Sequence, residues 1–118
     1  MKTKTITLPL PAKELSPNAR VHWAVLSKAK KSYRKEGYLC ALTAGIDHNY
    51  EFESYSLHFF FADKRRRDKD NFSARMKSGL DGIADATPQD DSEWDFDGVR
   101  FAIDKDNPRV EVRVILKD

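Results

Sequence analysis

The sequence of 118 residues has little of several features that would restrict its class. Its one cysteine, Cys40, can form no disulfide within the chain, and its apolar surroundings predict a small core residue. No apolar run approaches the roughly 20 residues that a bilayer-spanning helix needs, so we expect no membrane partner. The first residues lead into an alternating segment instead of the apolar core of a signal peptide. These absences predict a cytoplasmic protein.

The chain also lacks repeats, linkers and low-complexity tracts, and its length suits one domain over residues 1–118. Strand-like patterns mark four segments: 3–9, 55–62, 99–103 and 110–116. Helical spacing marks two segments: 24–44, ended by Gly45, and 71–84, capped by Asp70 or Asn71. The short connection 104–108 predicts a hairpin of the last two strands. The order β-α-β-α-β-β predicts an α+β fold with a small mixed sheet.

The charge of the chain is distributed unevenly, although its formal net value is only +2. Residues 1–40 carry nine Lys and Arg against two Glu, and residues 64–77 carry seven bases against two acids. Residues 81–97 carry seven acids and no base. A basic surface beside an acidic cluster fits a protein that binds a polyanion and needs a cation where it does chemistry.

The heptad 65–71, Arg-Arg-Arg-Asp-Lys-Asp-Asn, brings both kinds of charge together. In an extended segment, Asp68 and Asp70 project to the same face about 7 Å apart. Two such carboxylates repel each other unless a cation lies between them, and hard oxygen ligands suit Mg²⁺. The neighbouring arginines suit a phosphodiester. The heptad therefore suggests a nuclease, and the alternative interpretation is a solvent-exposed charge run at the end of a strand.

Phosphodiester cleavage needs more than two acids, and Asp90 and Asp91 are candidates for the third, beyond the second predicted helix. Lys77 follows Asp70 by seven residues on the second predicted helix. From there it could stabilise the pentacoordinate phosphate or orient the attacking water. Asp81 lies four residues after Lys77, a spacing that predicts an ion pair on one helix face more readily than a metal ligand.

An ordered set of motifs carries a resemblance to a known family. Asp68-Lys69-Asp70-Asn71 is followed by Lys77 with Leu80-Asp81-Gly82, and then by Asp90-Asp91. This order resembles the RusA-type Holliday-junction resolvases, whose pattern is an arginine run, Asp-x-Asp-Asn, a helix with a lysine and a Leu/Phe-Asp pair, and a later Asp-Asp. Residues 15–23, Leu-Ser-Pro-Asn-Ala-Arg-Val-His-Trp, resemble the Pro/Asn-rich loop after the first strand in phage members. The resemblance covers nearly the whole chain.

The resemblance implies a set of site residues. The metal ligands would be Asp68, Asp70 and Asp91, with Asp90 as the alternative to Asp91, and the metal would be Mg²⁺ or, as a substitute, Mn²⁺. The catalytic lysine would be Lys77. Because this assignment requires an insertion after Asp70, Arg75 remains a competing candidate.

The resemblance also implies a RusA-like homodimer that resolves four-way junctions and related branched DNA by paired nicks, in recombination and repair, often encoded by a prophage. A two-fold dimer would match the symmetry of the junction. The residues expected at the DNA are Asn18, His22, Lys28, Lys31, Lys35, Arg65, Arg66, Arg67, Lys69 and Arg75.

Several alternatives stay open at this stage. The three lysines of the first helix could form a solvated face. Trp23, after His22, could stack on an unpaired base or pack on the helix that it precedes. The whole chain could also be a non-catalytic branched-DNA-binding domain or an inactive prophage remnant that keeps the basic face.

Overall fold

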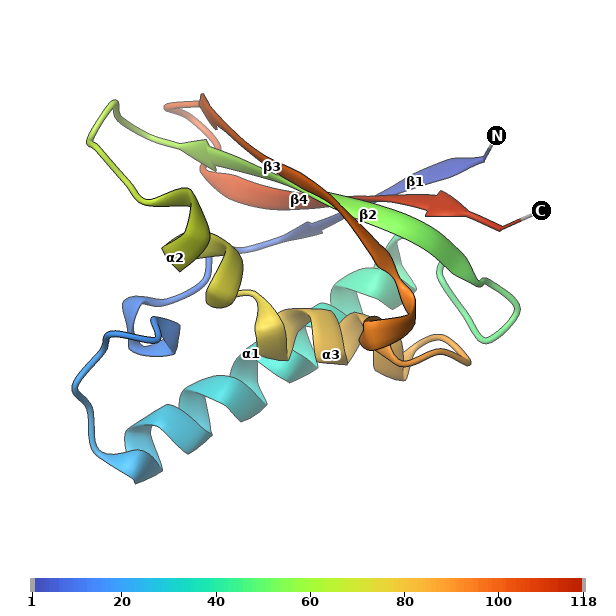
Figure 1. Cartoon of the computed structure of the whole chain (residues 1–118), viewed down its shortest axis with the longest axis horizontal. Helices are drawn as coiled ribbons and strands as arrows, with labels where there is room; N and C mark the ends of the chain where they lie inside the picture. The colour runs from blue at the N-terminus through green and yellow to red at the C-terminus, as the bar shows by residue number, and fades with distance from the viewer. Residues whose placement is uncertain (1, 118) are drawn as a thin grey trace.

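Four strands form one mixed sheet, and the computed structural model, which describes residues 2–117, places the helices on one of its faces (Figure 1). The strands are β1 (Thr3–Leu8), β2 (Phe52–Phe61), β3 (Asp95–Ile103) and β4 (Arg109–Leu116). The helices are α1 (Trp23–Thr43), α2 (Lys69–Ala74) and α3 (Lys77–Asp85), with short 3₁₀ turns η1 (Lys13–Leu15) and η2 (Asp91–Glu93). The predicted α+β class with a small mixed sheet is confirmed.

The predicted hairpin of the last two strands is wrong. The strand order is β1-β4-β2-β3, so β2 separates β3 from β4. β2 runs parallel to β3 and antiparallel to β4, and β4 is antiparallel to β1. Since β4 buries Val110, Val112 and Val114 completely, it takes an interior position with two neighbours, whereas the largely exposed β3 forms an edge. The connection 104–108 therefore passes the end of β2.

The second predicted helix is two helices, and its predicted N-cap is also wrong. Asp68 is the cap of α2, because its backbone is extended and its Oδ1 accepts a hydrogen bond from the Asn71 amide at 3.1 Å. The chain leaves α2 after Ala74 and begins α3 at Lys77. This break lets Phe72 pack edge-on against rings at the end of β2, while Met76 enters the main core.

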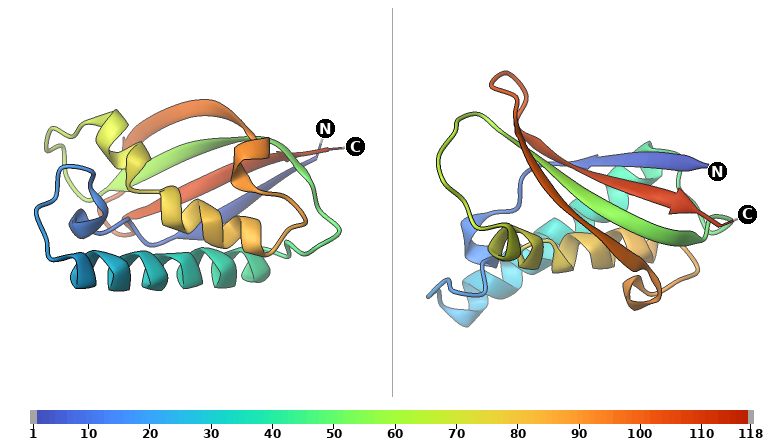
Figure 2. Two further views of the ribbon diagram at one scale, coloured as in Figure 1. Left: turned by 60° about the horizontal axis from the view of Figure 1, so that its bottom comes forward. Right: turned by 45° about the horizontal axis from the view of Figure 1, so that its top comes forward.

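α1 and α3 lie side by side on the same face of the sheet and pack on each other backbone to backbone, and α1 also contacts β1 (Figure 2). A Cβ atom added to Gly37 of α1 would overlap the carbonyl oxygen of Gly79, and one added to Gly82 would overlap the carbonyl oxygen of Arg34. Gly37 and Gly82 are therefore required because the two helix backbones approach each other too closely for a side chain. Gly82 of the Leu-Asp-Gly motif is explained by this contact.

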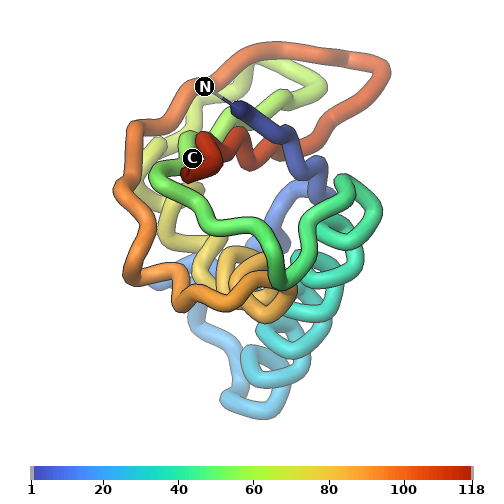
Figure 3. The backbone as a smooth tube through the Cα atoms, turned by 90° about the vertical axis from the view of Figure 1, so that its right-hand side faces the viewer, coloured from blue at the N-terminus to red at the C-terminus, as the bar shows by residue number. Residues whose placement is uncertain are grey.

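The predicted end of the first helix is confirmed. Gly45 follows the cap residue with φ +85°, and its amide donates to Leu42 O at 3.0 Å. The amide of the buried Ile46 donates to Ala41 O at 2.9 Å, which completes the two-bond pattern of a helix ending in a left-handed glycine. Figure 3 shows the connection (green) that then leads from α1 to β2. Over residues 2–117, no helix is long and apolar enough to cross a membrane.

Candidate active site

The first residue of α3, Lys77, holds together two acids from different parts of the chain. Its Nζ donates to both carboxylate oxygens of Asp91, at 2.8 and 3.0 Å, and to Asp81 Oδ1 at 3.0 Å. The Asp91 side chain is only 11% exposed, whereas that of Lys77 is 68% exposed. The hydrogen bonds from Lys77 to Asp91 and then to Asp81 raise the pKa of the lysine, so Lys77 is charged at neutral pH. The predicted pair of Lys77 with Asp81 is confirmed.

The structure separates the roles of Asp90 and Asp91. Asp90 caps η2, where its amide donates to Glu93 Oε2 at 2.7 Å and its Oδ2 accepts from Ser92 Oγ at 2.7 Å. The next residue, Asp91, then turns toward Lys77. Of the two adjacent acids, Asp91 alone accepts hydrogen bonds from Lys77.

A buried amide anchors the loop that presents Asp91. The Gln89 side chain accepts from the Phe52 amide at 2.6 Å and donates to the Phe52 carbonyl at 3.1 Å. It also accepts from Trp94 Nε1 at 3.0 Å, and Trp94 is buried against Phe52 and Tyr55. The loop is therefore fixed to the start of β2 on both sides of Asp91. Sequence reasoning missed Gln89.

Tyr55 is a further residue beside the cluster that sequence reasoning missed. Burial raises the pKa of its phenol, and the negative charge of Asp91 raises it further, while Lys77 acts in the opposite direction. The ring lies 5.1 Å from that of Phe96 and 5.9 Å from that of Trp94. Tyr55 thus forms a partly apolar wall next to the Lys77–Asp91 pair.

The acids of the heptad lie on α2. Asp68 caps this helix, and Asp70 is exposed in its first turn, where a negative charge is favoured by the helix dipole. α2 is tied to the N-terminal loop by Asn71, whose Nδ2 donates to Ser16 Oγ at 2.7 Å. The heptad acids are therefore presented on a short helix at the surface.

The predicted ligands have suitable chemistry but are not gathered into a metal centre. Carboxylate oxygens are the donors that Mg²⁺ prefers. Across residues 2–117, however, no three His, Cys, Asp or Glu side chains are grouped so that they could hold an ion. Asp68 serves as a cap and Asp91 is paired with Lys77. The oxygen ligands are thus of the type that Mg²⁺ prefers, but in this structure Asp91 forms an ion pair with Lys77 and Asp68 caps a helix.

The arginine run is organised by Asp63. The Asp63 carboxylate accepts from the Arg65 amide at 2.9 Å, from the Arg65 guanidinium at 3.2 Å and from Arg67 at 2.9 Å, and these bonds lower its pKa to about 2. The Arg67 guanidinium lies 4.0 Å from the Phe61 ring centroid, and its side chain is only 15% exposed. Arg67 therefore shapes the loop, whereas Arg66 is exposed.

Most of the other residues predicted to contact DNA occupy three further places. Lys28, Lys31 and Lys35 are exposed on α1, and none of them makes an ion pair within the part of the chain that the structure describes. Lys69 lies 5.8 Å from the Phe101 ring centroid. Asn18 and Arg75 lie beside a cavity near η1.

His22 and Trp23 begin α1. His22 is the N-cap, because its Nδ1 accepts from the Ala24 amide at 3.1 Å. Trp23 is 76% exposed, so the alternative in which it packs on its own helix is wrong. Its ring centroid lies 5.5 Å from that of His22, and the pair leaves an aromatic surface open at the start of α1.

Comparison with known proteins finds a relative without an assigned activity. No protein-family model matches the chain. An uncharacterized protein of Xylella fastidiosa (strain Temecula1) is 40% identical over 101 residues, which cover 77% of this chain. The chain spans 62% of the length of that relative. Because the name of the relative states no activity, the functional argument depends on the site itself.

Proposed function

We propose that this protein is an endodeoxyribonuclease that resolves four-way DNA junctions by paired nicks in recombination and repair. The observation that carries the proposal is the contact between Lys77 and Asp91. These residues are 14 positions apart in the sequence, and the RusA-like pattern assigns both to one active site. Their meeting directly after the helix that bears Asp68 and Asp70 supports that pattern.

The charges of the cluster suit phosphodiester chemistry in the presence of a cation. Lys77 faces two carboxylates, so the cluster itself is net negative and repels a phosphate. The residues that would hold Mg²⁺, or Mn²⁺ in its place, are Asp70 and Asp91 with Asp68. A bound divalent ion would offset most of this negative charge and lower the pKa of a water molecule. The exposed ammonium of Lys77 would stabilise negative charge that develops on the phosphate.

The basic side chains would supply most of the affinity for the DNA backbone. Arg65, Arg66 and Lys69 are exposed immediately before and within the first turn of α2. Contacts of this kind position a duplex without reading its sequence and make the affinity strongly dependent on salt. We further propose that the active form is a homodimer, because two equivalent sites related by a two-fold axis match a four-way junction.

The test is cleavage of a synthetic four-way junction in Mg²⁺ by wild-type protein and by Asp70→Asn. We expect the variant to lose nicking by at least about 100-fold while it keeps or tightens junction binding, since it loses an oxygen ligand and a negative charge near phosphate. Asp106→Asn, an equal charge change in the exposed turn before β4, is the matched control and should nick normally. Equal nicking by Asp70→Asn and wild type would contradict the proposal.

One observation favours a second candidate, a non-catalytic branched-DNA-binding domain or inactive prophage remnant. In the stretch from residue 2 to residue 117, the acids are not grouped as a metal centre. This candidate predicts a gel shift with a four-way junction and no nicking in either Mg²⁺ or Mn²⁺. The same assay therefore separates the two functions.

A further inference from the structure

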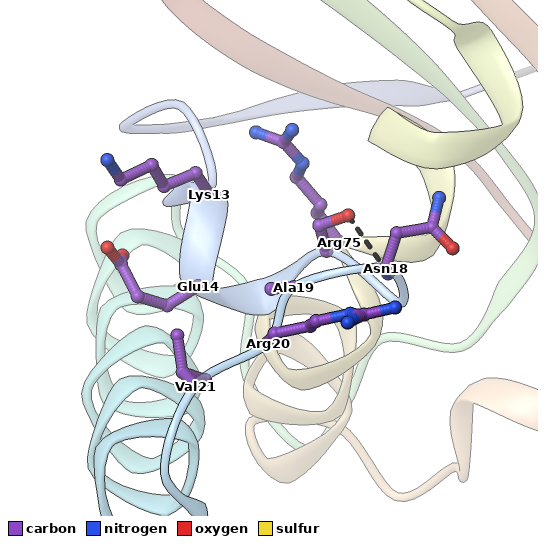
Figure 4. Close-up of a pocket in the computed structure, with 8 residues that line it drawn as sticks. Lys13, Glu14, Asn18, Ala19, Arg20, Val21 and Arg75 are labelled. Atoms are coloured by element: carbon purple, nitrogen blue, oxygen red, sulfur yellow. Dashed lines mark hydrogen bonds between the residues drawn. The ribbon is translucent and has the colours of Figure 1, made fainter.

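A basic cavity lies on the other side of α2 from the arginine run, between η1, the loop that follows it and Arg75. Its volume is about 350 Å³, and three cations, Lys13, Arg20 and Arg75, line it against one acid, Glu14. Figure 4 shows these side chains around the same space, with Asn18 at its edge. The cavity therefore has an excess of positive charge, which favours an anionic ligand.

The position of Arg75 is set by a chain of hydrogen bonds. Ser16 Oγ accepts from Asn71 Nδ2 at 2.7 Å, and Asn71 Oδ1 accepts from Arg75 Nε at 2.9 Å. Ser16 Oγ also accepts from the Asn18 amide at 3.2 Å. Asn71 thus joins the loop to α2 and orients the guanidinium. Within residues 2–117, the two terminal nitrogens of Arg75 make no hydrogen bond, so this edge is available to a ligand.

The environment of Arg75 differs from that of a paired surface arginine. Arg34 donates two hydrogen bonds to Asp85, at 2.7 and 2.8 Å. Arg75 is half-buried, its guanidinium lies 4.1 Å from the Phe72 ring centroid, and no carboxylate pairs with it in the described part of the chain. Burial lowers its pKa, although the charge of Glu14 acts against this shift. A partly desolvated guanidinium without a counterion is costly, and an anion would offset that cost.

We propose that this cavity binds a phosphate of the DNA backbone through Arg75, Lys13 and Arg20, and that Asn71 is the residue that positions Arg75. The inference rests on the proposed function, since it names a second DNA contact of the same protein. A phosphate matches the planar fork of a guanidinium.

The test measures the affinity for a four-way junction as a function of salt concentration. We expect Arg75→Gln to lower the slope of log affinity against log salt by about one, the loss of one phosphate contact. Arg75→Lys should keep the slope and lose part of the affinity, because it keeps the charge but not the fork. Arg100→Gln, an exposed arginine on β3, is the matched control and should leave the slope unchanged.

Two further variants separate binding from folding and from positioning. Arg20→Gln changes an exposed loop residue that does not support the core, and it should reduce the slope as Arg75→Gln does. Asn71→Ala should weaken binding in wild type and add little to Arg75→Gln, which is the coupling expected of a positioning residue. Slopes of Arg75→Gln and Arg20→Gln equal to that of the wild type would overturn this inference alone. A wild type that binds no junction would overturn the proposed function as well.

Discussion

The two halves of the candidate active site are built differently. Lys77, Asp81 and Asp91 are joined by hydrogen bonds, and the buried side chains of Gln89 and Trp94 hold the loop that carries Asp91. Asp68 caps and Asp70 begins a helix of six residues, which is held by Phe72 against aromatic rings of the sheet and by the hydrogen bond from Asn71 to Ser16. The first half is thus fixed by the fold itself. In the second half, both acids are exposed at the surface and neither forms an ion pair within residues 2–117, so their side chains should respond to ligands more strongly.

The largest expected effect is the loss of the ammonium that organises the fixed half. Lys77→Met should reduce nicking by about 10²–10³-fold, as does removal of a group that stabilises transition-state charge. It also leaves Asp81 and Asp91 without their partner, so junction binding should fall as their repulsion of phosphate grows. Single-turnover nicking of a labelled junction is the measurement.

Two matched variants sharpen this prediction. Lys77→Arg keeps the charge and should recover part of the nicking. Lys105→Met removes an equal charge from an exposed turn and should have no effect on nicking. If Lys77→Met nicks as fast as Lys105→Met, the fixed half takes no part in catalysis.

A second effect should appear when the support of Asp91 is removed. Gln89→Leu leaves the Phe52 amide, the Phe52 carbonyl and Trp94 Nε1 buried without partners, at a cost of about 2–4 kcal/mol in the free energy of unfolding. Nicking should fall as the loop loosens, even where the protein remains folded. Chemical denaturation measures the first effect and the junction assay the second.

Trp94→Phe provides the graded comparison for the same anchor. It removes one of the three hydrogen bonds and keeps an aromatic ring in the core, so it should cost about 1–2 kcal/mol. A Gln89→Leu protein as stable as Trp94→Phe would show that the amide is not the anchor of this loop.

The sequence predicted the parts of the fold that depend on local pattern. Alternation identified β4, and Gly45 marked the end of α1. Alternation tells which face of a strand is buried but not which strands lie beside it, so the β3–β4 hairpin was wrong. The break before Lys77 was also missed, because the helical spacing of Phe72 and Met76 continues across it.

In the candidate site, too, local pattern identifies some residues and tertiary packing decides the others. The pattern Asp90-Asp91-Ser92-Glu93 matches a capping box, and it would have assigned Asp90 as the cap and left Asp91 free to meet Lys77. No local signal identifies Gln89, since a polar residue in an acidic loop is usually exposed. Its burial follows from the position of the loop against β2, which is a tertiary property.

The smallest expected effect concerns the arginine run, which lies next to the second half, directly ahead of α2. The pKa of Asp63 is lowered from 3.8 to about 2, chiefly by the bond from the Arg65 amide, so its contribution to loop structure is complete above about pH 4 and is lost as the pH falls through 2. The Arg65 amide resonance should therefore shift between pH 4 and 2. Asp63→Asn should abolish this titration, and Asp47→Asn, which alters a different exposed turn, should leave it unchanged. An Arg65 amide that titrates in Asp63→Asn would show that another acid organises the loop, and the arginines would then owe their arrangement to something other than Asp63.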